Sequence, residues 1–594
     1  MKKIIYAAIC SMIMMMAGSC KKDFLDKAPL DQYGENIVWT DLGLVETFVN
    51  NIYYNIPYGY YGELMMASVC DETIHTYDGG SSNVTKSLVL PSDYSVFNSS
   101  WGLQTTRMAW NWSYKNIRAC NLFLEQVAKN TYSDEALRNR LTGEVYFLRA
   151  FYYHHLVFMY GGVPIIKNAY GLTDNFQQER GSFKDCIDLI TADCDKAASL
   201  LAAVTIDNKN KGRATEGAAL ALKSRVLLYA ASELYHNSSW LSGFTATQLV
   251  GYGGSGGRDA YWTAARDAAK AVMNLNRYDL YKKDPAPGDD IAENYRRIFL
   301  SKETTEDIFI RYLIPSSKKD NYNPGVYNGP NGYDSWGGNI PVSQVADAYD
   351  MQTGEKFDWN NITGGVNPYQ NRDPRFYANI LYDGAPFRPR SDDRKSLDPV
   401  GVIQIADRQK ADGSWQGGLD GRSTPIGAKE DGTLTGYYLA KFTDRSINPK
   451  VAIQDWSWRY IRYAEVLLNY AEASAALNQE AEARNTINLI RKRAGMPPIS
   501  SSGTALMESI RHERQIELMF EGQRYFDIRR WMIAPQVFSV GALGVKIAYP
   551  FGQTFPTYTI SEARNRKWEN KSYFLPIQID ELNRNGKLVQ NPLY

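Results

Sequence analysis

Apolar side chains recur at three- and four-residue steps in two separate parts of the chain, residues 107–275 and 458–531. This period predicts amphipathic helices, because residues so spaced share one helix face. The most regular stretch is residues 135–160, where Val145 and Leu148 belong to an apolar stripe along one helix face. Gly161 follows it and is a typical helix terminator. The predicted helices cover residues 107–130, 135–160, 183–201, 216–235, 261–275, 458–477, 480–494, 505–520 and 523–531.

The stretch between these parts, residues 281–457, has a different character. Gly, Pro, Asn and Asp dominate, and residues 320–341 and 383–435 form long loop-like stretches. Loops of this length in a compact protein are usually functional or disordered. We therefore predict a mainly α fold: a tetratricopeptide-like helical-hairpin scaffold with a long irregular, loop-rich ligand-binding insertion.

This pattern divides the chain into regions. Residues 20–280 form an N-terminal region with helical hairpins, and residues 281–594 form a C-terminal region. Within the latter, the loop-rich part 281–457 precedes hairpins at 458–531 and a C-terminal segment at 532–594. Because neither set of hairpins can bury its apolar faces alone, we expect residues 107–235 and 458–531 to pack as one unit.

The first twenty residues have the layout of an export signal. Lys2 and Lys3 precede an uncharged apolar run over residues 4–18, and small residues lead to Cys20. The run is too short to span a bilayer of ~30 Å. We predict a signal peptide at 1–19 and lipid attachment at Cys20, although Ala17 stands where leucine is common. The alternative is a secreted protein with an incidental Cys20.

Composition narrows the classes of function. The net charge is +1 and no basic stripe is interleaved with aromatics, so we predict no nucleic-acid partner. The 41 Tyr, 22 Phe and 13 Trp are unusual, because Tyr and Trp offer a flat apolar face with one polar group, which suits a sugar ring. The alternative for any one of them is a place between helices.

No catalytic or metal-binding spacing is evident. The five histidines lack zinc-site spacing, so we predict neither a metal site nor a cofactor. The tract 251–257 fits two glycine motifs, but no strand precedes it, which favours a flexible loop. Four cysteines in the mature chain besides Cys20 are not a disulfide scaffold. Whether any pair forms a disulfide, and whether a structural calcium ion binds, stays open.

A dense charged block occupies residues 511–530. Glu513, Glu517 and Glu521 recur every four residues and so stack on one helix face. Like charges there require nearby cations, which the interleaved arginines supply. We predict a structural ion-pair network, with an active site as the less favoured alternative.

Several short segments, in this order, resemble the SusD/RagB family. They are Leu148-Arg149-Ala150-Phe151-Tyr152-Tyr153, Tyr160-Gly161-Gly162-Val163-Pro164, Arg213-Ala214-Thr215, Ala221-Leu222-Lys223-Ser224-Arg225, Tyr460-Ile461-Arg462-Tyr463-Ala464-Glu465, Asn488-Leu489-Ile490-Arg491-Lys492-Arg493-Ala494-Gly495, Glu513-Arg514-Gln515-Ile516-Glu517-Leu518, Glu521-Gly522-Gln523-Arg524-Tyr525-Phe526-Asp527, Arg530-Trp531 and Gln590-Asn591-Pro592-Leu593-Tyr594. Together with the start at Cys20, the resemblance runs from the signal to the last residue.

The resemblance implies a non-enzymatic lipoprotein of the outer membrane, facing outside. Members cap a SusC-like TonB-dependent transporter and capture glycans for uptake, and the RagB branch takes peptides. Glycan and peptide ligands both stay open for this chain. A surface glycoside hydrolase is a further alternative, because the sequence does not reveal whether two carboxylates face one cleft.

We predict that the ligand contacts loop aromatics, chiefly Tyr333 and Trp336. Their glycine-rich segment lies outside the helical scaffold and has no obvious core to fill. Asp71 and Glu72 begin a polar loop, where carboxylates can accept hydrogen bonds from sugar hydroxyls. The remaining predicted contacts are Tyr77 and Trp101, the latter with a core position as its alternative.

Overall fold

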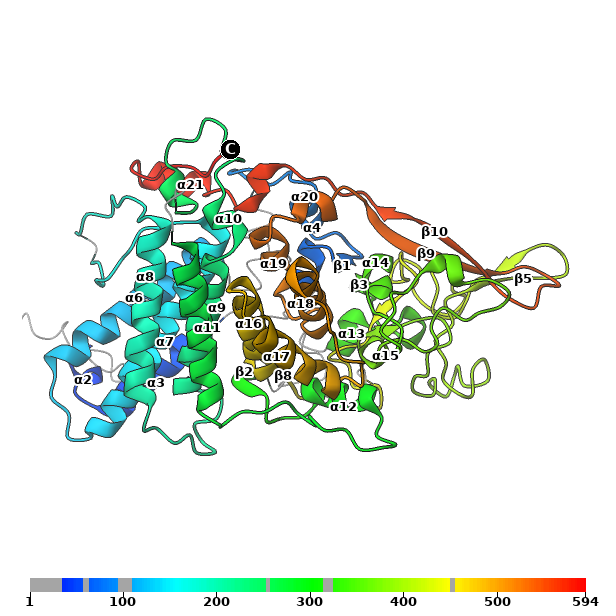
Figure 1. The fold of residues 1–594 in the computed structure, drawn as a ribbon, viewed down its shortest axis with the longest axis horizontal. Helices are drawn as coiled ribbons and strands as arrows, with labels where there is room; N and C mark the ends of the chain where they lie inside the picture. The colour runs from blue at the N-terminus through cyan, green and yellow to red at the C-terminus, as the bar shows by residue number, and fades with distance from the viewer. Residues whose placement is uncertain are drawn as a thin grey trace, which may run out of the picture.

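The computed structural model describes residues 35–56, 64–93, 109–171, 173–252, 257–313, 324–448 and 454–594. The fold is mainly helical, as predicted, and Figure 1 shows most long helices gathered on one side and an irregular part on the other. The two strands β9 and β10 extend away from the body at the far end of that irregular part. Cys20 and Trp101 lie outside the described residues.

The first group of helices forms successive antiparallel layers. It comprises α3 (Leu42–Tyr54), α6 (Trp110–Lys129), α7 (Glu135–Tyr160), α8 (Phe183–Leu201), α9 (Glu216–Ala230) and α11 (Arg258–Asn274). Each helix from α6 to α9 packs against the next, and α11 packs on α9. In α7 the Asp134 side chain accepts from the Leu137 N–H, and Gly161 ends the helix with a φ of +77°.

One predicted helix is interrupted. The prediction for 216–235 is wrong at residues 231–232, because α10 (Glu233–His236) begins as a separate turn. Ser232 has extended backbone angles there, and its hydroxyl accepts from Arg530 at 2.8 Å. At this break, the hydrogen bond from Arg530 therefore connects the first group of helices to the last helices of the chain.

The second group follows a strand. It comprises β8 (Trp456–Arg462), α16 (Tyr463–Ala476), α17 (Glu480–Arg493), α18 (Gly503–Glu517) and α19 (Arg524–Arg530). The prediction of a helix from residue 458 is wrong for its first five residues, which pair antiparallel with β2 (Asp307–Leu313). α16 packs against both α9 and α11, and the Arg225–Glu465 ion pair is buried in that contact. The two groups therefore pack together, as predicted.

Outside the two groups, the helices of the described residues are short. The 3-10 helices are η2 (Met66–Val69), η3 (Thr247–Leu249), η4 (Asn331–Tyr333), η5 (Trp359–Asn361) and η6 (Asn570–Tyr573). The short helices are α2 (Glu35–Val38), α4 (Ser81–Thr85), α12 (Ile291–Leu300), α13 (Pro324–Asn328), α14 (Ser343–Asp347), α15 (Pro374–Asn379), α20 (Ala534–Val537) and α21 (Ile579–Arg584).

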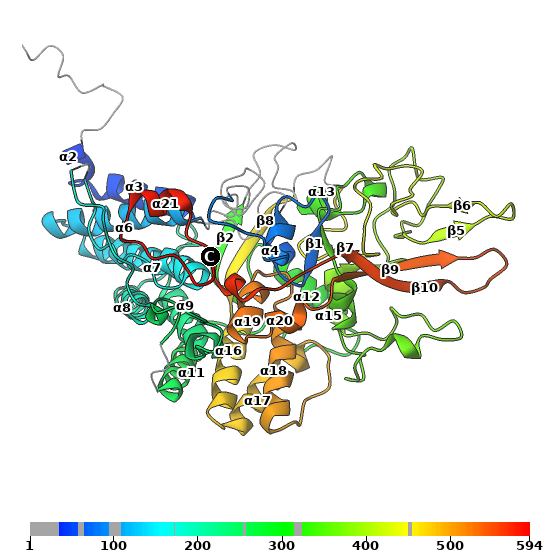
Figure 2. The ribbon, with the colours of Figure 1, turned by 90° about the horizontal axis from the view of Figure 1, so that it is seen from above.

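The strands of the described residues form four small sheets. They are β1 (Thr73–His75) with β3 (Asn339–Pro341), β2 with β8, β4 (Ile380–Leu381) with β7 (Tyr438–Leu439), and the order β10-β9-β5-β6. In the last sheet the sequence did not predict the hairpin of β9 (Ala542–Tyr549) and β10 (Thr557–Arg564), which β5 (Asp407–Gln409) joins in parallel. The fourth strand is β6 (Trp415–Gln416). Figure 2 shows this sheet projecting as an arm.

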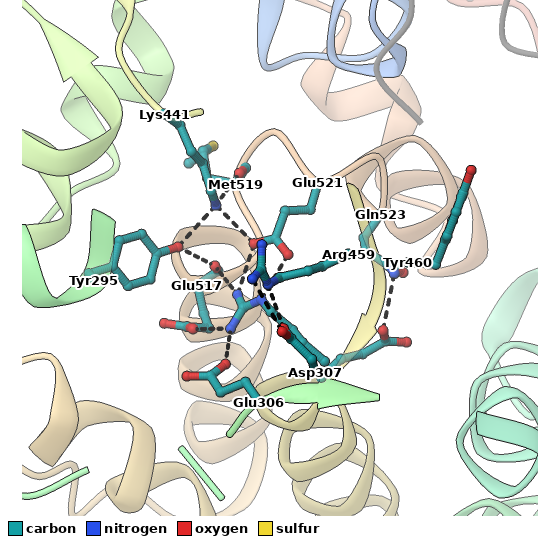
Figure 3. Close-up of polar contacts among 12 residues, drawn as sticks. Tyr295, Glu306, Asp307, Lys441, Arg459, Tyr460, Glu517, Met519, Glu521 and Gln523 are labelled. Atoms are coloured by element: carbon teal, nitrogen blue, oxygen red, sulfur yellow. Dashed lines mark hydrogen bonds and ion pairs between the residues drawn. The ribbon is translucent and has the colours of Figure 1, made fainter. Parts of the chain in front are cut away.

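The charged block of the last helices is a buried ion-pair network, as predicted. The prediction that the interleaved arginines neutralise Glu513, Glu517 and Glu521 is wrong, because the cations come from other elements: Arg375, Lys441, Arg462, Arg491 and Arg493. Arg462 bonds the carboxylates of Glu306, Glu517 and Glu521 at 2.7–2.8 Å. Lys441 reaches Glu521, the Tyr295 hydroxyl and the Met519 carbonyl (Figure 3). The charged side chains of this network are at most 6% exposed, and the network joins the loop-rich part to β8 and α18.

Three further findings concern the part of the chain that the structure describes. No helix in it is both long and apolar enough to cross a membrane. No group of three or more His, Cys, Asp or Glu side chains in the described ranges could hold a metal ion. The described cysteines, Cys70, Cys120, Cys186 and Cys194, are all buried free thiols, which answers the question of disulfides among them.

Candidate functional site

A short antiparallel sheet brings two distant loops together. In β1 and β3, Ile74 pairs with Ile340 and His75 pairs with Asn339. Just beyond the sheet, the Thr76 N–H donates to the Gly338 carbonyl at 2.7 Å. The loop after β1 therefore lies beside the loop before β3, although more than 250 residues separate them in sequence.

Two of the predicted ligand contacts meet on these loops. The Tyr77 hydroxyl lies 3.1 Å from the Trp336 carbonyl oxygen and within hydrogen-bonding distance of the Asp431 carboxylate. Tyr77 is 43% exposed, and Trp336 is half-buried. We call this region, formed by Tyr77, Trp336 and Asp431, the Tyr77–Trp336 surface.

Neighbouring residues fix the orientation of this surface. The Trp336 ring meets the buried Tyr327 ring edge to face, with centroids 5.1 Å apart and an angle of 80° between planes. Gly337 has a φ of +52°, and the Asp431 carbonyl oxygen lies 2.3 Å from the position that a Cβ would occupy. A side chain at residue 337 would clash with that oxygen, so only glycine lets the loop of Asp431 pack this closely against the loop of Trp336.

The expectation that Tyr333 has no core to fill is wrong. Its side chain is only 6% exposed and lies in the main hydrophobic core. The hydroxyl donates to the Arg388 carbonyl at 3.0 Å, and the ring packs edge to face on Phe387. The Arg390 guanidinium lies 4.3 Å from the ring centroid. The ring and the hydroxyl of Tyr333 are thus both engaged by protein, so Tyr333 supports the loop from within.

Asp71 and Glu72 are also directed inward, against the expectation of an accessible polar loop. Arg524 binds Asp71 through two nitrogens at 2.8–3.1 Å. Burial alone would raise the pKa of Asp71, but the Arg524 guanidinium holds it below the usual value. Glu72 is 1% exposed, accepts from the Phe520 N–H at 3.1 Å, and has its pKa raised by burial to about 8. Both carboxyls therefore anchor β1 to the helical scaffold.

Asp431 is the contact that the sequence did not indicate. It lies in the loop-rich stretch, 354 residues from Tyr77, and no local pattern marks it. Its carboxylate beside an exposed tyrosine gives the surface an acceptor next to an aromatic face. Such a pairing suits a ligand with an apolar face and hydroxyl groups at its edge.

A helical-hairpin scaffold that carries a polar and aromatic surface on its loops is typical of a ligand-binding protein. Two family descriptions match the sequence. The description "SusD family" matches residues 305–594, and "Starch-binding associating with outer membrane" matches residues 23–228. The chain belongs to the SusD/RagB family, as the sequence segments indicated.

Known proteins similar to this chain carry the same family name. SusD-like protein P38 of Formosa agariphila is 24% identical over 447 residues, which is 73% of this chain and 74% of that protein. A SusD-like protein of Bacteroides fragilis is 29% identical, with a TM-score of 0.76 over 96% of this chain and 100% of its own. A SusD-like carbohydrate-binding protein of Bacteroides fragilis, at 22% identity and a TM-score of 0.70, shares the fold over 93% of this chain and 100% of its own.

Proposed function

We propose that this protein is a lipid-anchored outer-membrane protein, facing outside, that binds glycans at the Tyr77–Trp336 surface. It delivers them to a SusC-like TonB-dependent transporter without cleaving them. The observation that supports the glycan assignment most directly is the meeting of Tyr77, Trp336 and Asp431 on loops outside the helical scaffold. Family membership supports the class of ligand and the transporter partner.

The surface has the two kinds of contact that a sugar requires. An aromatic face stacks on the apolar face of a pyranose, and Trp and Tyr provide that face with little loss of side-chain entropy. A carboxylate such as Asp431 accepts hydrogen bonds from hydroxyl groups and so sets the orientation that stacking leaves undetermined. Tyr333, Asp71 and Glu72 contribute by holding the two loops, and they make no direct contact in this proposal.

Replacing Trp336 by alanine should weaken binding of the cognate glycan by roughly ten- to a hundred-fold. Loss of one stacking face costs about 1–3 kcal/mol, by analogy with base–aromatic stacking. The measurement is calorimetric titration, with the ligand first identified by screening glycan and peptide libraries. Trp415→Ala is the matched control, because Trp415 is a 50% exposed tryptophan on β6 and is not one of the residues that form this surface. Unchanged affinity in a folded Trp336 variant would place the binding surface elsewhere.

A peptide ligand and catalytic turnover are the alternatives that the same experiments address. If peptides bind and glycans do not, the RagB-type function replaces the proposed one. The glycan recovered after prolonged incubation with the protein should be intact. Cleavage that copurifies with the chain would instead support a surface glycoside hydrolase.

Lipid attachment at Cys20 has its own test. Replacing Cys20 by serine should release the protein from the membrane fraction, because the thiol is the acylation site and each buried CH₂ contributes about 0.8 kcal/mol to anchoring. Fractionation followed by immunodetection measures this. Protease accessibility on intact cells then distinguishes an outward-facing protein from a periplasmic one. Full membrane retention of the serine variant would contradict the anchor.

A further inference from the structure

A small polar cavity lies apart from the Tyr77–Trp336 surface. It has a volume of about 280 Å³ and opens between α12, α15 and residues 380–386. In Figure 1, α12 lies at the lower edge of the molecule and β1 well above it. Four charged side chains line the cavity, together with two tyrosines and a small apolar wall. The charged groups are Asp290, Glu293, Arg296 and Arg445, and the tyrosines are Tyr377 and Tyr382.

The two carboxylates of the cavity are already engaged. Asp290 caps α12 by accepting from the Glu293 N–H at 2.9 Å. Glu293 pairs with Arg296 at 2.9 Å and with Arg297, outside the cavity, at 2.6 Å. The charged lining therefore consists of two arginines and two carboxylates, and its formal charges balance. Arg296 is the arginine that pairs with Glu293.

Arg445 is the other arginine of the lining. Its one protein hydrogen bond in the described ranges is from a terminal nitrogen to the Tyr377 carbonyl at 2.5 Å, and no described carboxylate lies within 4.0 Å of it. The Nε of Arg445 and that of Arg296 are buried without partners. Burial and the nearby Arg296 charge lower the pKa of Arg445 to about 10. Arg445 is half-buried, whereas the fully buried arginines Arg375, Arg390 and Arg530 bind carboxylates directly.

We infer that this cavity is a second binding site, for the carboxylate of an acidic sugar such as a uronic acid. A guanidinium with open donors binds a planar carboxylate through two parallel hydrogen bonds. Tyr382 and Pro386 offer apolar contact to a sugar ring beside that group. The volume is close to the lower limit of small-ligand sites, roughly 300 Å³, so it suits one monosaccharide unit.

The inference extends the proposed glycan binding to acidic glycans, but the two sites are tested separately. The full-length chain is titrated with sodium glucuronate, with glucose and with sodium sulfate. Glucuronate should bind, and Arg445→Gln should weaken that binding at least tenfold. Arg297→Gln is the matched control, because Arg297 contacts the same Glu293 but is 59% exposed outside the cavity. Trp336→Ala should leave glucuronate binding unchanged, so failure at either site is distinguishable from failure at the other.

Each outcome decides the inference. If Arg445→Gln lowers the melting temperature, Tyr382→Ala replaces it and should weaken glucuronate binding while leaving the protein folded. Equal binding of glucose and glucuronate would overturn the role of the charge. Arg445-dependent binding of sulfate without binding of glucuronate would overturn the sugar assignment. Unchanged glucuronate affinity in folded Arg445 and Tyr382 variants would place the anion elsewhere.

Discussion

Replacing Arg462 by methionine should lower the free energy of unfolding by about 3–5 kcal/mol, because it leaves buried carboxylates without a cation. Arg462 contacts three of them, Glu306, Glu517 and Glu521, and is itself 1% exposed. Methionine fills much of the same volume but donates no hydrogen bond. The remaining cations, Lys441 among them, compensate only part of the negative charge. Denaturation midpoints for the variant and the native chain measure the effect.

The effect should depend on pH in a defined direction. Burial alone would raise the pKa values of Glu517 and Glu521. The charges of Arg493 and Arg462 lower the pKa of Glu517, and the charge of Arg462 lowers that of Glu521, so both lie below the usual range. Their contribution to stability is therefore present above that range and is lost as the pH falls. In the methionine variant these carboxyls take up protons more readily, so the difference from the native chain should narrow between pH 7 and pH 5.

Arg297→Met is the control for this prediction. Arg297 also binds a glutamate, at 2.6 Å, but its side chain is 59% exposed. Exposed ion pairs contribute only about 0–1 kcal/mol. An Arg462 variant that is no less stable than the Arg297 variant would mean that the buried network adds nothing beyond surface pairing.

Sequence patterns predicted the long helices well and the strands poorly. α7 and α8 have the predicted bounds, because their apolar period and their terminators are local signals. The first residues of a predicted helix form β8 instead, where they pair with β2. The sequence pattern missed this because β2 is about 150 residues away in the chain. The aromatic and β-branched residues of Trp456–Arg462 fit a strand, but only the pairing selects that conformation.

The candidate site was also predicted only in part, and again the missing part depends on contacts between distant residues. The glycine-rich loop indicated Trp336, whose partner Tyr77 was also predicted, but no local pattern joined the two. Tyr333 in the same loop is buried because Phe387 and Arg388 come from another loop of the insertion. The inward direction of Asp71 depends on Arg524, 453 residues later. Local composition thus identifies a loop, whereas burial of each side chain within it is set by non-local contacts.

Replacing Glu72 by glutamine should stabilise the protein at alkaline pH. Glu72 is 1% exposed, and it accepts hydrogen bonds from the Phe520 N–H at 3.1 Å and from the Cys70 thiol at 3.8 Å. Burial raises its pKa from 4.5 to about 8, with the negative charge of Asp71 adding to that effect and the Phe520 N–H opposing it. Glutamine has the same shape as the protonated acid and keeps the acceptor for Phe520.

The sign of the pH dependence follows from proton binding. Below pH 4.5 the carboxyl is protonated in both the folded and the unfolded chain, so the stabilisation from the raised pKa is fully present. Between pH 4.5 and about 8 only the folded chain holds the proton, and stability falls as the pH rises. The carboxylates whose pKa values are lowered, such as Asp71 and Glu521, titrate below this window and do not obscure it.

Melting temperatures of the native chain and the glutamine variant should therefore agree near pH 5 and separate toward pH 9. Each pKa unit corresponds to about 1.36 kcal/mol, so the variant should gain roughly 2–4 kcal/mol at the alkaline end. Glu430→Gln is the control. Glu430 is exposed, so this substitution should change the melting temperature neither near pH 5 nor near pH 9. Parallel curves for the Glu72 variant and the native chain would mean that Glu72 is ionised in the folded protein across this range, with a cation or water compensating its charge.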